Sequence, residues 1–310
     1  MHLIPTRRNL AAGAATLLVG SFASAAVLIP AASAATKPGT GKPAIVIGDK
    51  NFPEENILGT LYAQALQAKG YKVKLKDNIG DSEIIWKAFQ AGQIDLYPEY
   101  TGTLLSAVAG QTTLPTSASE AYTQAKTFAQ TKGATLFAAT PFADSDALAA
   151  KAATASTNNW STISDLAAKG KALKLGGAPE FETRQEGLVG LKKAYGINPT
   201  FKPIAIGLSY KALDSGAVGA QDVFTTDPQL VGGKYKLLTD PKGVFGFQNV
   251  APVVNQKVAT AEGPEFETTI NDVSKLLTLP AVQALNKAVE IDKQPASTVA
   301  AQFLEANNLS

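Results

Sequence analysis

Two nine-residue stretches of this chain match each other without a gap. WKAFQAGQI at residues 86–94 aligns with YKALDSGAV at residues 210–218. Each stretch reads as the end of an amphipathic helix, a glycine that stops it, and the start of a strand. Carried forward, the same register places Tyr100 opposite Phe224. An internal repeat of one α/β unit predicts two similar lobes, with chance similarity between two helix-glycine-strand segments as the alternative.

The residues around the first copy follow a β-α-β-α-β order. The short apolar run AIVIG at residues 44–48 predicts a strand covered on both faces, and residues 71–76 and 94–97 predict two more. Helices are expected in the two intervening segments. A similar strand at residues 173–177 and a helix at residues 183–195 are predicted ahead of the second copy. This order is typical of a mainly parallel sheet with helices on its faces.

The predicted fold class is therefore α/β, a two-lobed clamp in which each lobe is a mainly parallel sheet flanked by helices. Apolar strands are interrupted by turn residues near 141–146 and 247–253, and these segments are expected to cross between the lobes. Two crossings make the first lobe discontinuous. We expect lobe 1 at residues 44–142 and 252–310, and lobe 2 at residues 143–251.

The N-terminus predicts export. Residues 11–29 carry no charge and follow the paired Arg7 and Arg8, which is typical of a twin-arginine signal. Small residues near the end of this region predict a signal peptide of residues 1–34. General secretory export and an uncleaved membrane anchor stay open as alternatives. The polar segment 35–43 is expected to be a disordered leader, and the protein is expected to be periplasmic or extracellular, associated with the cell envelope.

Composition excludes several classes of function for the exported chain. Loss of the signal peptide removes two of the 28 basic residues and none of the 26 acidic ones, so the formal charge falls from +2 to zero, and the only histidine is lost as well. The chain has no cysteine. Catalytic triads with histidine, cysteine nucleophiles, zinc sites with nitrogen or sulfur ligands, and iron–sulfur clusters are thereby excluded. We expect a monomeric binding protein that is not an enzyme, with no cofactor, metal or nucleic acid.

Polar and aromatic residues gather where strands of both lobes are expected to end. Lys50 follows the first strand and Tyr100 and Thr103 follow the third, while Arg184 and Phe224 hold the corresponding places in lobe 2. Ligands of doubly wound sheets bind beyond the carboxyl ends of the strands. Cations, rings and a hydroxyl suit a small ligand with an anionic end and an organic cationic end. Each residue alone is more often a surface charge or a core ring, so the prediction rests on their joint position.

Five blocks of sequence, in order, resemble the glycine betaine/choline/carnitine substrate-binding protein family of osmoprotectant ABC importers. The resemblance spans nearly all of residues 44–310 and implies a two-lobed, type II periplasmic-binding-protein-like clamp. It also implies capture of a small quaternary-ammonium or related zwitterionic compound, with separate membrane permease and ATPase subunits as partners. The blocks are GDKNFPEE (48–55), GQIDLYPEYTGT (92–103), ADSDAL (143–148), FETR (181–184) and DVFTTD (222–227).

The resemblance also implies roles for individual residues. Lys50, Thr103 and Arg184 match the family's contacts to the anionic end of the ligand. Tyr100 matches the first ring of its aromatic cage.

Three other cage positions depart from the family pattern. Betaine binders commonly carry tyrosines where this chain has Asp146, Phe224 and Gln248. Phe224 keeps an aromatic face, whereas the carboxylate at 146 and the amide at 248 offer hydrogen-bonding groups instead. We therefore expect poor binding of simple glycine betaine.

Three rival interpretations stay open from the sequence. The fold could bind a different polar or amino-acid-like ligand. A carboxylate-dependent hydrolase would use a pair such as Glu99 and Glu182, although pairs of acids are easy to find among 26. A ligand-binding sensor domain is the third, and the absence of a long apolar run after residue 34 speaks against it.

Overall fold

The computed structural model of the chain describes residues 36–310. The predicted signal peptide, residues 1–34, lies outside the described residues. Within the described part, no helix is both long enough and apolar enough to cross a bilayer.

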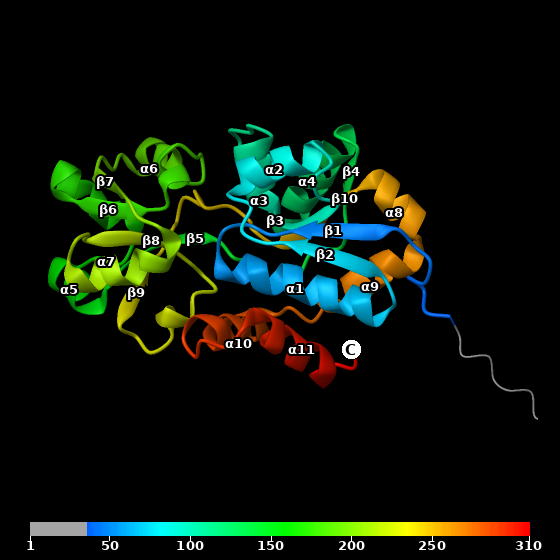
Figure 1. Cartoon of the computed structure of the whole chain (residues 1–310). Helices are drawn as coiled ribbons and strands as arrows, with labels where there is room; N and C mark the ends of the chain where they lie inside the picture. The colour runs from blue at the N-terminus through cyan, green and yellow to red at the C-terminus, as the bar shows by residue number, and fades with distance from the viewer. Residues whose placement is uncertain (1–35) are drawn as a thin grey trace, which may run out of the picture. The chain divides into compact units, whose positions relative to one another are not determined.

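Residues 37–310 contain two five-stranded sheets of the same topology (Figure 1). The first has the order β2-β1-β3-β10-β4 and the second the order β7-β6-β8-β5-β9. In each sheet one strand, β10 or β5, runs antiparallel to its neighbours, and the other four run parallel. The strands are β1 (Ala44–Gly48), β2 (Lys72–Lys76), β3 (Leu96–Tyr100), β4 (Ala134–Leu136), β5 (Asp146–Lys151), β6 (Lys174–Gly177), β7 (Thr200–Pro203), β8 (Ala220–Phe224), β9 (Tyr235–Leu238) and β10 (Val250–Asn255).

The prediction of an α/β fold with two mainly parallel sheets is confirmed. The matching stretches at residues 86–94 and 210–218 each lead out of a helix into the central strand of a sheet, β3 in one and β8 in the other. The repeat therefore marks equivalent places in the two sheets.

Helices cover the faces of both sheets. α1 begins with Pro53 at its first position and has Glu54 and Glu55 in its first turn, as helix N-termini favour. Its apolar side packs with the C-terminal helices α9 to α11, which lie beside it in orange and red (Figure 1). The helices are α1 (Pro53–Ala68), α2 (Ser82–Gln90), α3 (Thr101–Thr103), α4 (Ala118–Thr131), α5 (Ala152–Asn158), α6 (Leu188–Tyr195), α7 (Ser209–Ser215), α8 (Gln256–Glu262), α9 (Pro264–Ser274), α10 (Leu279–Glu290) and α11 (Ala296–Ala306).

The segment before α6 differs from the sequence expectation of a helix starting at residue 183. Residues Pro179–Glu182 form a 3₁₀ turn, and α6 begins only at Leu188. Gly187 makes the tight turn possible, because a side chain there would meet the carbonyl oxygen of Phe181 at 2.3 Å. Arg184 therefore lies in a turn and not in a helix.

The disordered leader at residues 35–43 stays a prediction, and part of that segment packs against the fold. Residues 38–41 form a turn in which Gly39 donates a backbone hydrogen bond to Lys69 (3.0 Å). The backbone of Gly39 approaches Tyr71 so closely that a Cβ would lie 2.2 Å from its nitrogen. Glycine in this segment suggested disorder from composition, but Gly39 permits close packing against Tyr71 because it has no side chain.

Two connecting segments run side by side between the sheets. The chain leaves the first sheet after β4 and returns to it at β10, and Ala143 pairs with Asn249 in an isolated antiparallel bridge. The backbone N–H of Asp144 also donates to the carbonyl of Gln248 (3.1 Å). The lobe boundaries given above stay a prediction, and β10 begins at Val250, two residues before the expected return.

Candidate functional site

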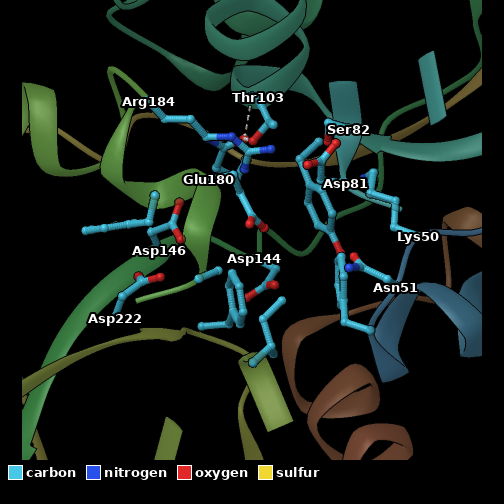
Figure 2. Close-up of a pocket in the computed structure, with 17 residues that line it drawn as sticks. Lys50, Asn51, Asp81, Ser82, Thr103, Asp144, Asp146, Glu180, Arg184 and Asp222 are labelled. Atoms are coloured by element: carbon cyan, nitrogen blue, oxygen red, sulfur yellow. Dashed lines mark hydrogen bonds between the residues drawn. The ribbon is translucent and has the colours of Figure 1, made fainter. Parts of the chain in front are cut away.

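Side chains from both sheets surround one small cavity of about 50 Å³ (Figure 2). A cavity of this volume is too small for a polymer. All seven residues singled out in the sequence line it, so the structure brings the whole set together. They are Lys50, Tyr100, Thr103, Asp146, Arg184, Phe224 and Gln248.

The Lys50 ammonium lies between two buried carboxylates. Its Nζ is 2.7 Å from Oε1 of Glu99 and 3.2 Å from Oε1 of Glu55, and the Lys50 side chain is only 2% exposed. One ammonium does not neutralise two carboxylates, and burial raises the pKa of Glu55 to about 8. The Lys50 charge is therefore already balanced by the protein, and its contact with an anionic ligand group stays a prediction.

Three aromatic rings stand in a row along the cavity. Phe52 stacks on Tyr100 with ring centroids 6.2 Å apart, and on Phe224 with centroids 5.9 Å apart and planes 10° from parallel. The Tyr100 hydroxyl donates to Glu54 (2.8 Å), and Lys50 Nζ lies 4.3 Å from the Tyr100 ring centroid. Phe52 was missed as a site residue in the sequence, although it lies two residues after Lys50 in the first matching block.

Thr103 and Gln248 bind one another. Oε1 of Gln248 accepts hydrogen bonds from the Thr103 backbone N–H (2.9 Å) and from its hydroxyl (3.2 Å). Gly102 permits this approach, since a Cβ there would lie 2.7 Å from Gln248 Nε2. The Gln248 amide thus secures α3, directly after β3, to the returning segment.

Arg184 joins the two halves of the site. Its Nη2 is 2.6 Å from Oε2 of Glu83 on α2, and its Nε donates to Oε1 of the same carboxylate (3.2 Å). This two-bond geometry lowers the pKa of Glu83, although its partial burial opposes the shift. A role of Arg184 in holding a ligand carboxylate stays a prediction, and the guanidinium bonds Glu83 in this structure.

Carboxylates outnumber cations around the cavity. Asp146 and Asp222 lie beside each other, on the opposite side of the cavity from Lys50 and Asn51 (Figure 2). Burial raises the pKa of Asp146 to about 6 and the pKa of Asp222 well above its usual range. The acidic lining residues are Asp81, Asp144, Asp146, Glu180 and Asp222, against Lys50 and Arg184.

The hydrolase pair considered from the sequence does not form. Glu182 is exposed and does not line the cavity, and Glu99 is buried against Lys50. Two catalytic carboxylates have to flank the bond that they cleave. This pair does not flank the cavity.

A family profile described as the substrate-binding domain of the ABC-type glycine betaine transport system matches residues 43–306. The chain belongs to this family. Its members are extracytoplasmic substrate-binding proteins of ABC transporters. The resemblance seen in the sequence is thereby confirmed.

Two curated relatives have similar sequences. A glycine-betaine-binding protein of Pseudomonas aeruginosa is 34% identical over 85% of this chain and 88% of its own length. The ergothioneine transport permease/ergothioneine binding protein EgtU of Helicobacter pylori is 30% identical over 96% of this chain. The chain spans only 53% of the length of that second relative.

Solved structures share the fold of this binding protein. A glycine betaine/carnitine/choline ABC transporter structure superposes with a TM-score of 0.69 at 25% identity, covering 86% of this chain and 99% of the other. A choline binding protein in complex with choline gives a TM-score of 0.63 at 15% identity, covering 86% and 89%. The second likeness concerns the fold alone.

The stability of the empty binding protein is expected to fall as pH rises from about 5 to 8. Burial raises the pKa of Asp146 to about 6 and the pKa values of Glu186 and Asp227 to about 7. In the unfolded chain these groups ionise near pH 4, so at pH 5 the folded state binds more protons, and that stabilisation is lost as pH rises through each raised value. Thermal unfolding at pH 5, 6.5 and 8 checks this. A midpoint that climbs across the series would contradict it.

Proposed function

We propose that this protein is the extracytoplasmic substrate-binding subunit of an ABC importer, and that it captures a small quaternary-ammonium or related zwitterionic compound by closing its two lobes. It acts in the periplasm or on the outer side of the cell membrane and delivers its ligand to a membrane permease driven by an ATPase. Membership of the family supports the transport role. The observation that carries the ligand class is the row of three rings, Tyr100, Phe52 and Phe224, beside a carboxylate-rich cavity.

The aromatic rings and the acidic side chains both favour an organic cation as the ligand. Aromatic faces attract a cation through their quadrupole, by about 0.5 to 2 kcal/mol depending on desolvation. Those of the lining acids that are ionised add a negative potential in the same space. Because the rings and acids come from both sheets, only the closed arrangement completes the site, and a ligand that contacts both halves shifts the protein toward closure.

Calorimetry with choline, glycine betaine, carnitine and ergothioneine tests the ligand class, and small-angle scattering with the tightest of them tests closure. We expect micromolar binding of at least one and a smaller radius of gyration in its presence. If a screen of amino acids yields the tightest ligand and none of the four binds, the rival proposal of a polar or amino-acid-like ligand is favoured.

Phe224→Leu is expected to weaken binding of a quaternary-ammonium ligand by about threefold to tenfold, because leucine fills similar space without an aromatic face. The matched control is Phe128→Leu, which removes a ring that packs at a tilt against Trp86 and does not line the cavity. Isothermal titration of both variants gives the comparison. Equal losses in the two would mean that the Phe224 ring makes no specific contact with the cation.

A further inference from the structure

The charged side chains around the cavity favour a cationic ligand over an anionic one, because both cations that line it are already paired with protein carboxylates. Lys50 is held by Glu55 and Glu99, and Arg184 is held by Glu83. No other Lys or Arg lines the cavity among residues 36–310. A ligand carboxylate would have to compete with protein carboxylates at 2.6 to 3.2 Å for each of these cations.

Asp222 is a buried lining acid with one oxygen that receives no hydrogen bond. It is 4% exposed, and no donor within the described chain reaches its Oδ1. A buried acceptor without a donor is destabilising, so such groups are found where a water or a ligand supplies the missing hydrogen bond. Its place in the cavity wall makes the ligand the candidate donor (Figure 2).

Asp146 stands next to Asp222 because of strand register. β5 pairs antiparallel with β8, with Asp146 opposite Phe224. Asp222 lies two residues before Phe224 on β8, and residues two apart in a strand share a face. Both carboxyl groups and the Phe224 ring therefore lie on one face of the sheet, which lines the cavity.

The surroundings of the pair are mainly acidic. Arg184 is the cation that favours ionised Asp146, while Glu180 and Asp227 act against ionisation of the pair. Two adjacent carboxyl groups in such a place share a proton when the site is empty. A cation that donates a hydrogen bond satisfies them better than water does.

We propose that Asp146 and Asp222 form a subsite that accepts a hydrogen bond from an O–H or N–H group of the ligand, so that the protein prefers a net organic cation with such a donor to a zwitterion without one. The proposal rests on the proposed function and deepens it, because it names which member of the quaternary-ammonium class is favoured. The trimethylammonium end lies against the rings, and the donor end lies against the acid pair. A carboxylate end, as in glycine betaine, would meet Asp146 and Asp222 with like charge.

Three probes test the subsite on the full exported chain: choline, its O-methyl ether, and glycine betaine. The ether keeps the cation and loses only the donor. A hydrogen bond to a charged group predicts that choline binds at least about tenfold more tightly than the ether. Choline is likewise expected to bind more tightly than betaine.

Two variants test whether the preference for choline over its ether depends on Asp146 and Asp222. Asp222→Asn and, separately, Asp146→Asn should reduce the choline-to-ether ratio to about threefold or less, since an amide oxygen accepts more weakly than a carboxylate. Asp214→Asn, which changes an exposed acid on α7, should leave the ratio at its wild-type value. Unfolding midpoints verify that each variant is folded, and the wild-type ratio itself needs no variant.

The possible outcomes distinguish failure of the subsite from failure of the proposed function. Equal binding of choline and its ether by the wild-type protein overturns the subsite while leaving the proposed function intact. So does a ratio that neither Asp variant changes, or betaine bound more tightly than choline. If none of the three probes binds and carnitine and ergothioneine do not bind either, the proposed function fails, and the subsite fails with it. If only carnitine or ergothioneine binds, the subsite alone is overturned.

Discussion

Lys50→Met is expected to lower the free energy of unfolding by about 3 to 5 kcal/mol at pH 8, the cost of removing one partner from a buried ion pair. The substitution keeps an apolar chain of similar length but leaves Glu55 and Glu99 facing each other without a cation, in a place where their side chains are at most 1% exposed. Urea unfolding monitored by circular dichroism measures the change. At pH 5 the loss should be smaller, because Glu55, whose pKa burial raises to about 8, is then protonated and no longer a stranded charge.

Two controls separate burial from charge. Adding Glu99→Gln to Lys50→Met should restore part of the stability, since one of the stranded charges is removed. Lys287→Met breaks an exposed pair with Asp292 and should cost less than about 1 kcal/mol. A Lys50 variant as stable as the wild type would show that the ammonium contributes nothing net to the fold.

Arg184→Gln and Glu83→Gln are each expected to weaken ligand binding by about tenfold. The two-bond contact between these side chains joins α2 to the turn after Pro179–Glu182, and so stabilises the closed arrangement in which the site is complete. The apparent affinity falls with the fraction of protein able to adopt that arrangement. Because this ion pair is partly exposed, we expect the loss of affinity to lie at the lower end of the range for hydrogen bonds to charged groups.

The pair of variants also distinguishes two roles for Arg184. If the guanidinium links the lobes, both single variants and the double variant should lose affinity to the same extent, for choline and betaine alike. If it holds a ligand carboxylate, Glu83→Gln should free it and strengthen betaine binding. Calorimetry of the four proteins with both ligands decides between a bridge and a ligand contact.

The fold could be predicted because its signals are local. The apolar run at 44–48, the glycine after each matching helix and the gapless repeat all lie within short windows, and they indicate strands and helices without knowledge of distant contacts. Strand ends indicated Lys50, Tyr100, Thr103, Arg184 and Phe224, the family resemblance added Asp146 and Gln248, and all seven line one cavity.

The partners of the charged residues could not be predicted in this way. Arg184 and Glu83 are 101 residues apart, and no periodicity relates them. Glu99 reaches Lys50 only because β1 and β3 are neighbours in the sheet. The sequence therefore indicated free cations where the structure has neutralised ones.

Asp222, by contrast, could have been identified from the sequence as a candidate site residue. It lies two residues before Phe224 in a strand, and the alternation of side chains puts the two on one face. Reading the strand with a period of two would have added this acid to the candidate site. The absence of a donor to its Oδ1 could come only from three-dimensional packing.

The bridge between Ala143 and Asn249 has a consequence for the ancestry and engineering of the chain. The second sheet is built from residues 146–238 without interruption, and the segments that lead to and from it are hydrogen-bonded neighbours. The chain enters and leaves this half of the protein at adjacent points. A hairpin connection of about two to five residues would therefore span the gap left by its removal, so that this half can be exchanged as one continuous segment. Recombination can thus exchange one wall of the binding site as a unit, altering ligand choice while the other half, with its C-terminal helices, is inherited unchanged.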